Sequence, residues 1–145
     1  MHGDISPKNI LFRDSAPIIL DAECASMGDP SFDLAFCMNH LILKAIHLPA
    51  SCQQLLVSAL TLWQAYQPHI NWEHVSKLEA RVCQLLPALM LARVDGKSPV
   101  EYLDEENQAR IRAIAIPFIE TPLVTLKDFI TALQLNLAQS EPNDA

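Results

Sequence analysis

From residue 31 onward, apolar residues recur every three or four positions, in stretches that are separated by proline or glycine. The first stretch shows the pattern in Leu34, Met38, Leu41 and Ala45. This spacing is that of one face of an amphipathic helix, and proline stops such a helix because it has no backbone N–H to donate. The sequence therefore predicts a mainly α-helical chain beyond residue 31.

The expected helix ends follow from capping residues and helix breakers. Ser31 or Asp33 is expected to cap the first helix, and Asn71 and Asp104 are expected to cap two later ones. Gly96 is expected to end the third helix in a left-handed conformation. The expected helices span residues 34–45, 51–66, 72–94, 105–118 and 122–137, with one helical turn at 99–103.

Two short apolar runs near the N-terminus, residues 10–12 and 18–20, flank the turn-forming residues 14–17. Apolar runs on either side of a turn cluster are typical of a β-hairpin. A hairpin brings Asn9, at the start of one strand, near Asp21, at the end of its partner. The predicted fold class is therefore mainly α, with a small β-hairpin near the N-terminus.

The polar residues around this hairpin suit phosphoryl transfer. Asn9 and Asp21 offer an amide oxygen and a carboxylate, which are hard oxygen ligands of the kind that Mg²⁺ takes alongside substrate phosphates. Asp4 lies five positions before Asn9 (9 − 4 = 5), so a loop can hold its carboxylate near such a metal to accept the proton of an attacking hydroxyl. Asp and Asn also favour ordinary turns, but their order between apolar runs favours the catalytic interpretation.

Two segments carry a specific family resemblance. The segment HGDISPKNILF (2–12) resembles the catalytic loop of the aminoglycoside phosphotransferase and choline kinase-like family, relatives of the protein kinases. The segment LDAECASMGDPSFDLAF (20–36) resembles the metal-binding segment that follows that loop. The resemblance implies the helical C-terminal lobe of a kinase-like fold, with ATP as phosphoryl donor and Mg²⁺ as cofactor.

The same resemblance implies a role for each motif residue. Asp4 would be the catalytic base, and Asn9 and Asp21 would be the magnesium ligands. His2 and Asp33 would brace the catalytic loop. The acceptor would be a small molecule with a hydroxyl group, and aminoglycosides, choline, homoserine and sugars all remain open.

In that family, a nucleotide-binding lobe precedes the catalytic loop and supplies a phosphate-covering loop and a lysine on a strand. This chain begins at the catalytic loop and contains three glycines, none of them in a glycine-rich loop. We therefore expect residues 1–138 to form the catalytic lobe without the nucleotide-binding lobe, and residues 139–145 to form a flexible tail. The chain is then either an incomplete phosphotransferase, inactive alone, or a catalytically inactive kinase-like binding or structural module.

Other charged residues have two interpretations each. Lys8 either contacts the transferring phosphate or is a solvated loop lysine, and the second is favoured. Glu23 lies two positions after Asp21, so on a strand it would point to the same side, where it either contacts substrate or has a structural role. The cluster at the end of the third helix, Arg93, Asp95 and Lys97, is interpreted as a salt-bridged cap rather than as a binding edge.

The composition of the chain restricts the kinds of partner that it can bind. The net charge of −7, from 17 acidic and 10 basic residues, argues against a nucleic-acid partner, which requires a basic surface. Apolar stretches are interrupted well before bilayer length, so no membrane span is expected. Half of the residues are hydrophobic, which indicates an exposed apolar face and hence self-association. The four cysteines include no CxxC pair and are expected to be thiols in the cytoplasm.

Overall fold

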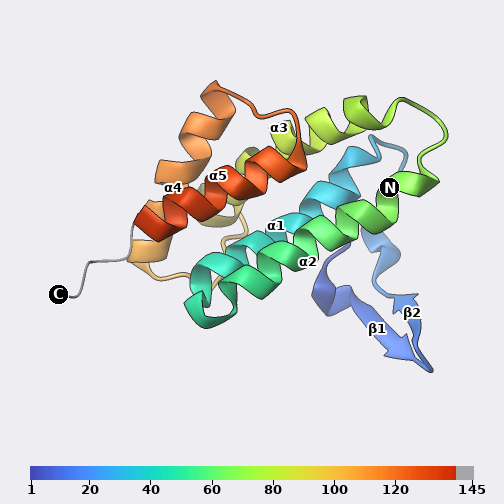
Figure 1. Ribbon diagram of the computed structural model, residues 1–145. Coiled ribbons are helices and arrows are strands. Elements are labelled where there is room, and N and C mark those ends of the chain that lie inside the picture. Colours follow the sequence, from blue (N-terminus) through green and yellow to red (C-terminus); the bar gives the residue numbers. More distant parts are fainter. Residues whose placement is uncertain (140–145) are drawn as a thin grey trace.

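Five α-helices follow an N-terminal β-hairpin in the computed structural model, which describes residues 1–139 (Figure 1). The strands are β1 (Ile10–Arg13) and β2 (Ala16–Ile19), and the helices are α1 (Ser31–His47), α2 (Cys52–Tyr66), α3 (Val75–Asp95), α4 (Glu105–Glu120) and α5 (Leu126–Gln139). The mainly α fold class with a small hairpin near the N-terminus is confirmed. Gln139 ends α5, and the rest of the predicted tail lies outside the described residues.

The hairpin turns on two residues only. Asp14 and Ser15 have φ angles of 49° and 66°, and two successive left-handed residues match the right-handed twist of the flanking strands. The predicted turn at 14–17 was therefore too long, because its last two residues belong to β2. Pro17 pairs with Phe12 in the antiparallel register. Proline is tolerated there because each strand of a two-stranded sheet has an open edge.

Two helix starts differ from the expectation. The third helix begins at Val75 rather than at residue 72, and the Nδ1 atom of His74, not Asn71, accepts the capping bond from the backbone of Ser76 at 3.3 Å. The last helix begins at Leu126 rather than at residue 122. Its start is set by Thr125, whose hydroxyl accepts a bond from the backbone N–H of Asp128 at 3.1 Å. Both helices therefore begin where a side chain accepts a hydrogen bond from the first turn, which is a few residues later than the sequence indicated.

Of the two other expected helix caps, the one at α4 is present and the one at α1 is not. Asp104 caps α4 as expected, because its carboxylate accepts a bond from the backbone N–H of Asn107 at 2.8 Å. The cap expected from Ser31 or Asp33 at α1 is wrong. The carboxylate of Asp29 accepts the bond from the backbone N–H of Ser31 instead, at 2.9 Å.

Gly96 ends α3 without a left-handed conformation. Its φ and ψ are −86° and −172°, so the expected conformation is wrong, although its N–H still donates to the carbonyl of Ala92 at 3.2 Å. Glycine fits because a Cβ atom at this position would lie 2.3 Å from the same carbonyl oxygen. The helical turn expected at 99–103 does not form, since Val100 donates its N–H back to the carbonyl of Arg93 at 2.9 Å.

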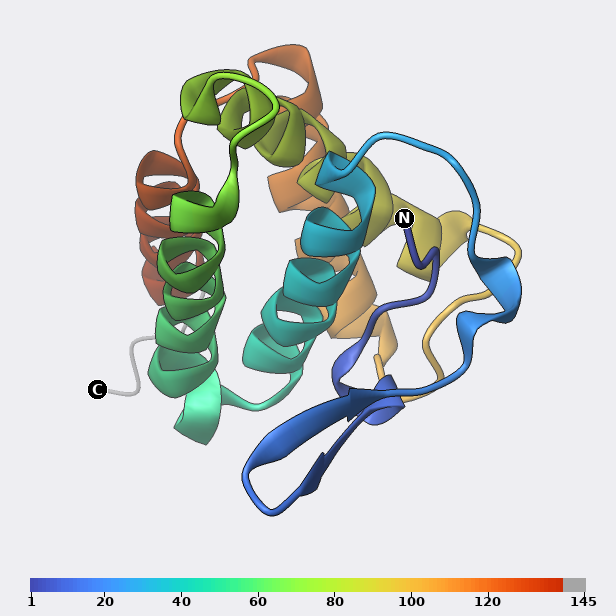
Figure 2. The ribbon, with the colours of Figure 1, turned by 90° about the vertical axis from the view of Figure 1, so that its right-hand side faces the viewer.

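The helices enclose one apolar core, and the hairpin projects from it (Figure 2). Helix α1 packs against α2 and α3, α3 packs against α4, and α5 contacts α2 and α3. The largest completely buried side chains include Phe129, Met38, Ile42, Leu86 and Met90. None of the helices within residues 1–139 is both long enough and apolar enough to cross a bilayer.

Candidate active site

The loop formed by residues 1–9 is attached to the first turn of α1 by one carboxylate. The backbone N–H groups of His2 and Gly3 donate to the two oxygens of Asp33 at 2.5 and 2.8 Å. Gly3 has a φ of 86°, and a Cβ atom there would lie 2.6 Å from the carbonyl oxygen of Cys24. Glycine at this position therefore lets the loop pass close to the segment that follows the hairpin.

The imidazole of His2 connects the loop to the end of the hairpin. Its Nδ1 atom lies 3.3 Å from the backbone nitrogen of Asp4, which donates to it. Its Nε2 atom lies 3.0 Å from the carbonyl oxygen of Leu20, which can only accept. The two contacts together fit the tautomer that carries its proton on Nε2. His2 thus contacts the backbone on both sides and holds the loop beside the residue that precedes Asp21.

Asp4 and Asn9 are in direct contact. The amide nitrogen of Asn9 donates to the backbone carbonyl of Asp4 at 2.9 Å and to its Oδ2 atom at 3.0 Å. The amine of Lys8 lies 3.7 Å from the same Oδ2 atom. Asn9 is buried, whereas 26% of the Asp4 side chain is exposed. The carboxylate is therefore fixed through one oxygen, and its Oδ1 atom takes part in none of these contacts.

Asp21 lies next to this pair but does not touch it. The backbone N–H of Leu20 donates to the carbonyl of Asn9 at 2.9 Å, which extends the hairpin ladder by one pair. Asp21 follows with φ and ψ of 65° and 53°, a left-handed conformation that is uncommon outside glycine and costs on the order of 1–3 kcal/mol. Within residues 1–139, its exposed side chain makes no hydrogen bond to Asp4 or Asn9.

The donor atoms suit a magnesium ion that is shared with phosphates. The two bonds from Asn9 use its amide nitrogen, which leaves the amide oxygen for a cation. In the described part of the chain, no three His, Cys, Asp or Glu side chains form a metal site by themselves. Mg²⁺ is usually held by one or two carboxylates together with water and substrate phosphates. Asn9 and Asp21 fit that kind of site.

Glu23 does not occupy the position expected for it. It lies in a 3₁₀ turn (Ala22–Cys24) rather than on a strand, because the left-handed backbone of Asp21 turns the chain at the end of the hairpin. The strand on which the inference of a shared side with Asp21 depended is therefore absent, and Glu23 is exposed. Lys8 is also exposed, over 69% of its side chain, beside Asp4.

A charged network that sequence reasoning missed supports the segment before α1. Arg81 of α3 donates from Nε and Nη2 to the two oxygens of Asp29 at 2.8 and 3.2 Å. Its Nη1 and Nη2 atoms donate to Glu73 at 2.8 and 2.6 Å. Burial acts to raise the pKa of Asp29, but the bonds from Arg81 and from the backbone of Ser31 outweigh burial and keep that pKa below its ordinary value. No local sequence signal joins residues 52 positions apart.

Arg93 and Asp95 do not form the expected salt-bridged cap. Asp95 instead pairs with Arg112 of α4, whose Nη2 atom lies 2.7 Å from its Oδ1 atom. Arg93 lines a cavity of about 520 Å³ beside the catalytic loop. The cavity residues come from the loop, α1, α2, the end of α3 and the segment before α4, and are Ser6, Pro7, Lys8, His40, Leu41, Lys44, Leu55, Arg93, Pro99, Val100, Glu101 and Tyr102.

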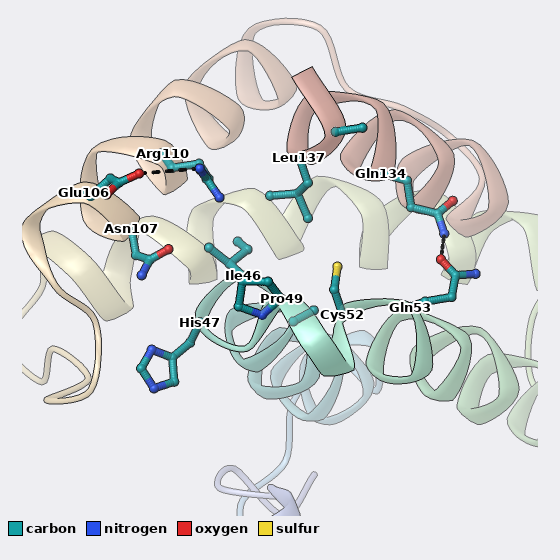
Figure 3. Close-up of a pocket in the computed structure, with 12 residues that line it drawn as sticks. Ile46, His47, Pro49, Cys52, Gln53, Glu106, Asn107, Arg110, Gln134 and Leu137 are labelled. Atoms are coloured by element: carbon teal, nitrogen blue, oxygen red, sulfur yellow. Dashed lines mark hydrogen bonds and ion pairs between the residues drawn. The ribbon is translucent and has the colours of Figure 1, made fainter. Parts of the chain in front are cut away.

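A second cavity, of about 560 Å³, lies between the end of α1, the start of α2, and α4 and α5 (Figure 3). An ion pair between Arg110 and Glu106, at 3.6 Å, lies on one side of it. A hydrogen bond from Gln134 to Gln53, at 2.9 Å, lies on another side. None of the predicted site residues lines this cavity, so it is separate from the catalytic loop.

Comparison with known protein families gave a match over the loop and the segment that follows it. Residues 1–69 match the model of the Phosphotransferase enzyme family. This match confirms the resemblance, because it includes both motifs, the hairpin, α1 and α2. It indicates phosphotransferase activity in general terms, over slightly less than half of the chain. No match was found among curated proteins.

Proposed function

We propose that the protein is a phosphotransferase that moves the γ-phosphoryl group of ATP to a hydroxyl group of a small molecule. The observation that carries the proposal is the contact between Asp4 and Asn9, at 3.0 Å, inside a loop that matches the phosphotransferase family. A carboxylate that is fixed through one oxygen presents the other in a defined direction. Positioning of this kind is the main contribution that a protein makes to phosphoryl transfer.

In this proposal Asp4 accepts the proton of the attacking hydroxyl through its Oδ1 atom. The hydrogen bond from the amide of Asn9 and the nearby amine of Lys8 orient the carboxylate of Asp4. Asn9 and Asp21 hold Mg²⁺ through oxygen atoms. When bound, this ion would neutralise part of the charge of the phosphates.

The strained backbone of Asp21 supports its role as a ligand. A left-handed aspartate persists only where the surrounding structure enforces it, and such residues concentrate at functional sites. Here the ladder bond from Leu20 to Asn9 and the His2 contact at the Leu20 carbonyl fix the residue before it. The backbone that carries the carboxylate of Asp21 is therefore held in a fixed position beside Asn9.

We propose a cytoplasmic location for this activity. Cys24 is exposed, Cys37 and Cys83 are buried, and all three are thiols. Burial, together with the nearby carboxylates of Glu79 and Asp128, raises the pKa of Cys83 to about 12, so that this thiol stays protonated. Exposed thiols such as Cys24 are typical of reducing compartments.

The test compares Asp4→Asn and Asp21→Asn with Asp14→Asn, which changes another exposed, left-handed aspartate in the same region. Phosphoryl transfer from Mg-ATP to a panel of hydroxyl compounds and Mg-ATP binding by calorimetry are measured in a form that also carries a nucleotide-binding lobe, because the catalytic lobe is expected to be inactive alone. Asp4→Asn should lower transfer by about 10²- to 10⁴-fold, the usual contribution of a general base, and leave Mg-ATP binding unchanged. Asp21→Asn should remove the magnesium dependence of ATP binding.

Asp14→Asn should match the unchanged protein in both measurements. Transfer at an unchanged rate in Asp4→Asn would refute the assignment of the base. Mg-ATP binding without transfer to any hydroxyl compound would favour the inactive kinase-like module instead.

A further inference from the structure

The cavity of about 520 Å³ that Arg93 lines opens beside the loop that carries the proposed catalytic base, and its lining includes Lys8 but not Asp4 itself. Ser6 and Lys8 of the loop form one side of it, and the amine of Lys8 lies 3.7 Å from Asp4. Helix α1 contributes a second side, and the end of α3 with the segment before α4 contributes a third. A molecule in this cavity would thus contact the loop that carries Asp4, and Lys8 would lie between them.

The charged lining of this cavity is mainly basic. Lys8, Lys44 and Arg93 reach it from three different elements, and Glu101 is the single carboxylate among the lining residues. None of the ion pairs found within residues 1–139 involves Lys44 or Arg93. The basic lining contrasts with the net charge of −7 of the chain. Three of the ten basic residues of the chain thus line this one cavity.

Several buried polar atoms around the cavity have no hydrogen-bond partner within the described residues. They are Ser6 Oγ, His40 Nε2, Arg93 Nε and Tyr102 OH. Ser6 is completely buried. Native proteins satisfy most buried polar groups, because an unpaired group loses the bond that water gave it. The hydroxyl groups and the guanidinium can all donate, and a small rotation of the side chains that cover them would let them reach oxygen atoms of an anion.

The titration of His40 is consistent with a positive potential in the cavity. Burial is the largest cause that lowers the pKa of His40, and Arg93 lowers it further. The charges of Lys8 and Lys44 act in the same direction, and only Asp4 acts against them. A group among these cations is thus disfavoured when it becomes positive, and an anion would be favoured in its vicinity.

We propose that this cavity recognises an anionic group, a carboxylate or a phosphate, on the small molecule whose hydroxyl is phosphorylated. The inference rests on the proposed function, because it assigns the cavity to the acceptor of the Asp4 reaction. Arg93 provides a planar set of donors that fits either oxyanion. Lys44, whose amine lies 3.6 Å from the centre of the Tyr102 ring, provides a second charge across the cavity.

Four pyranose sugars of similar shape test the charge preference. Binding of glucuronate, glucose 6-phosphate, glucose and glucosamine to the chain is measured by calorimetry without ATP. At least one of the two anionic sugars should bind about tenfold or more tightly than glucose and glucosamine, as hydrogen bonds to charged groups allow. The tighter of the two identifies a carboxylate or a phosphate as the recognised group. Equal binding of all four, or no binding of either anion at tens of millimolar, would overturn the proposal.

Substitutions then locate the binding. Arg93→Gln and Lys44→Gln should each weaken binding of the anionic sugar by about tenfold. Lys127→Gln removes the same charge from an exposed position on α5 and should change nothing. Because Arg93 is partly buried, the fold of each variant is checked by circular dichroism, and Lys44→Gln decides the matter if Arg93→Gln is unfolded. Unchanged affinity in a folded Lys44→Gln would overturn the proposal.

The outcome separates this inference from the proposed function. Asp4→Asn should lose transfer and keep its affinity for the anionic sugar. Anion binding without transfer to any hydroxyl would refute the proposed function while supporting anion recognition by the cavity. Efficient transfer to glucose or glucosamine, at the same rate in Lys44→Gln as in the unchanged protein, would support the function and refute the anionic acceptor.

Discussion

His40 illustrates how one side chain responds to its position in the fold. Its ring packs edge-on against Phe36 of the same helix, with the ring centroids 5.0 Å apart, and it faces the cations of the cavity. Burial and those cations lower its pKa below the ordinary value of 6.5. His40 therefore takes up its proton less readily in the folded protein than in the unfolded chain.

This difference gives stability a defined pH dependence. Below about pH 6.5 the unfolded chain binds a proton at His40 that the folded protein does not, so the free energy of unfolding should fall as the pH drops toward the lowered pKa. Urea unfolding at about pH 7 and about pH 5 should show this loss, and His40→Gln should reduce it. His69→Gln, at an exposed site, is the control. The same loss in His40→Gln would contradict the assignment.

Some residues of the site were predictable from the sequence and others were not. The contact between Asp4 and Asn9 follows from a spacing of five residues, which a short loop can close. His40 and Arg93 are far apart in the sequence and meet only because α1 packs against α3. The ion pair expected between Arg93 and Asp95 does not form for the same reason, because Asp95 pairs with Arg112 of another helix.

At the level of elements, a salt-bridge network connects α3 to the segment that leads into α1. Arg81 contacts Asp29 before α1 and Glu73 before α3, and Asp29 also accepts the first backbone N–H of α1, from Ser31. The network therefore fixes the start of the helix that carries Asp33. Helix starts were also the least predictable features of the elements, except at α4, where Asp104 was expected as the cap.

Removal of Arg81 should change how the free energy of unfolding depends on pH under acidic conditions. Because the pKa of Asp29 is lowered in the folded protein, its stabilising contribution is present above its ordinary pKa of 3.8 and is lost as the pH falls through the lowered value. Arg81→Met should raise the pKa of Asp29 and weaken this acid dependence, as measured by NMR titration of its carboxyl group. Arg112→Met, which breaks a similar exposed pair, should leave the titration of Asp29 unchanged.

At the level of the whole molecule, the hairpin presents apolar side chains to solvent. Phe12 is 73% exposed and Ile19 is 53% exposed, while Met27 after the hairpin is completely exposed. Contiguous apolar surface of this kind favours association. The overall helical fold was predictable because its periodicity is local, whereas the shape of the cavities depends on packing between distant segments.

We propose that a second copy of the chain covers this apolar face. Sedimentation should show an average mass that rises with protein concentration. Phe12→Ser and Ile19→Ser should each reduce this rise, because they remove apolar area from the hairpin. Leu135→Ser, at a site on α5 that is 59% exposed, should not. A single monomeric species at all concentrations would contradict the proposal.

Helix α1 contacts both the loop of the proposed catalytic base and the cavity of the proposed acceptor. Its first turn holds the backbone of the catalytic loop through Asp33, and eleven residues later, at about 1.5 Å per residue, Lys44 lines the cavity. One helix therefore sets the distance between the loop that presents the base and the charge that meets the acceptor, without any contact between the two groups.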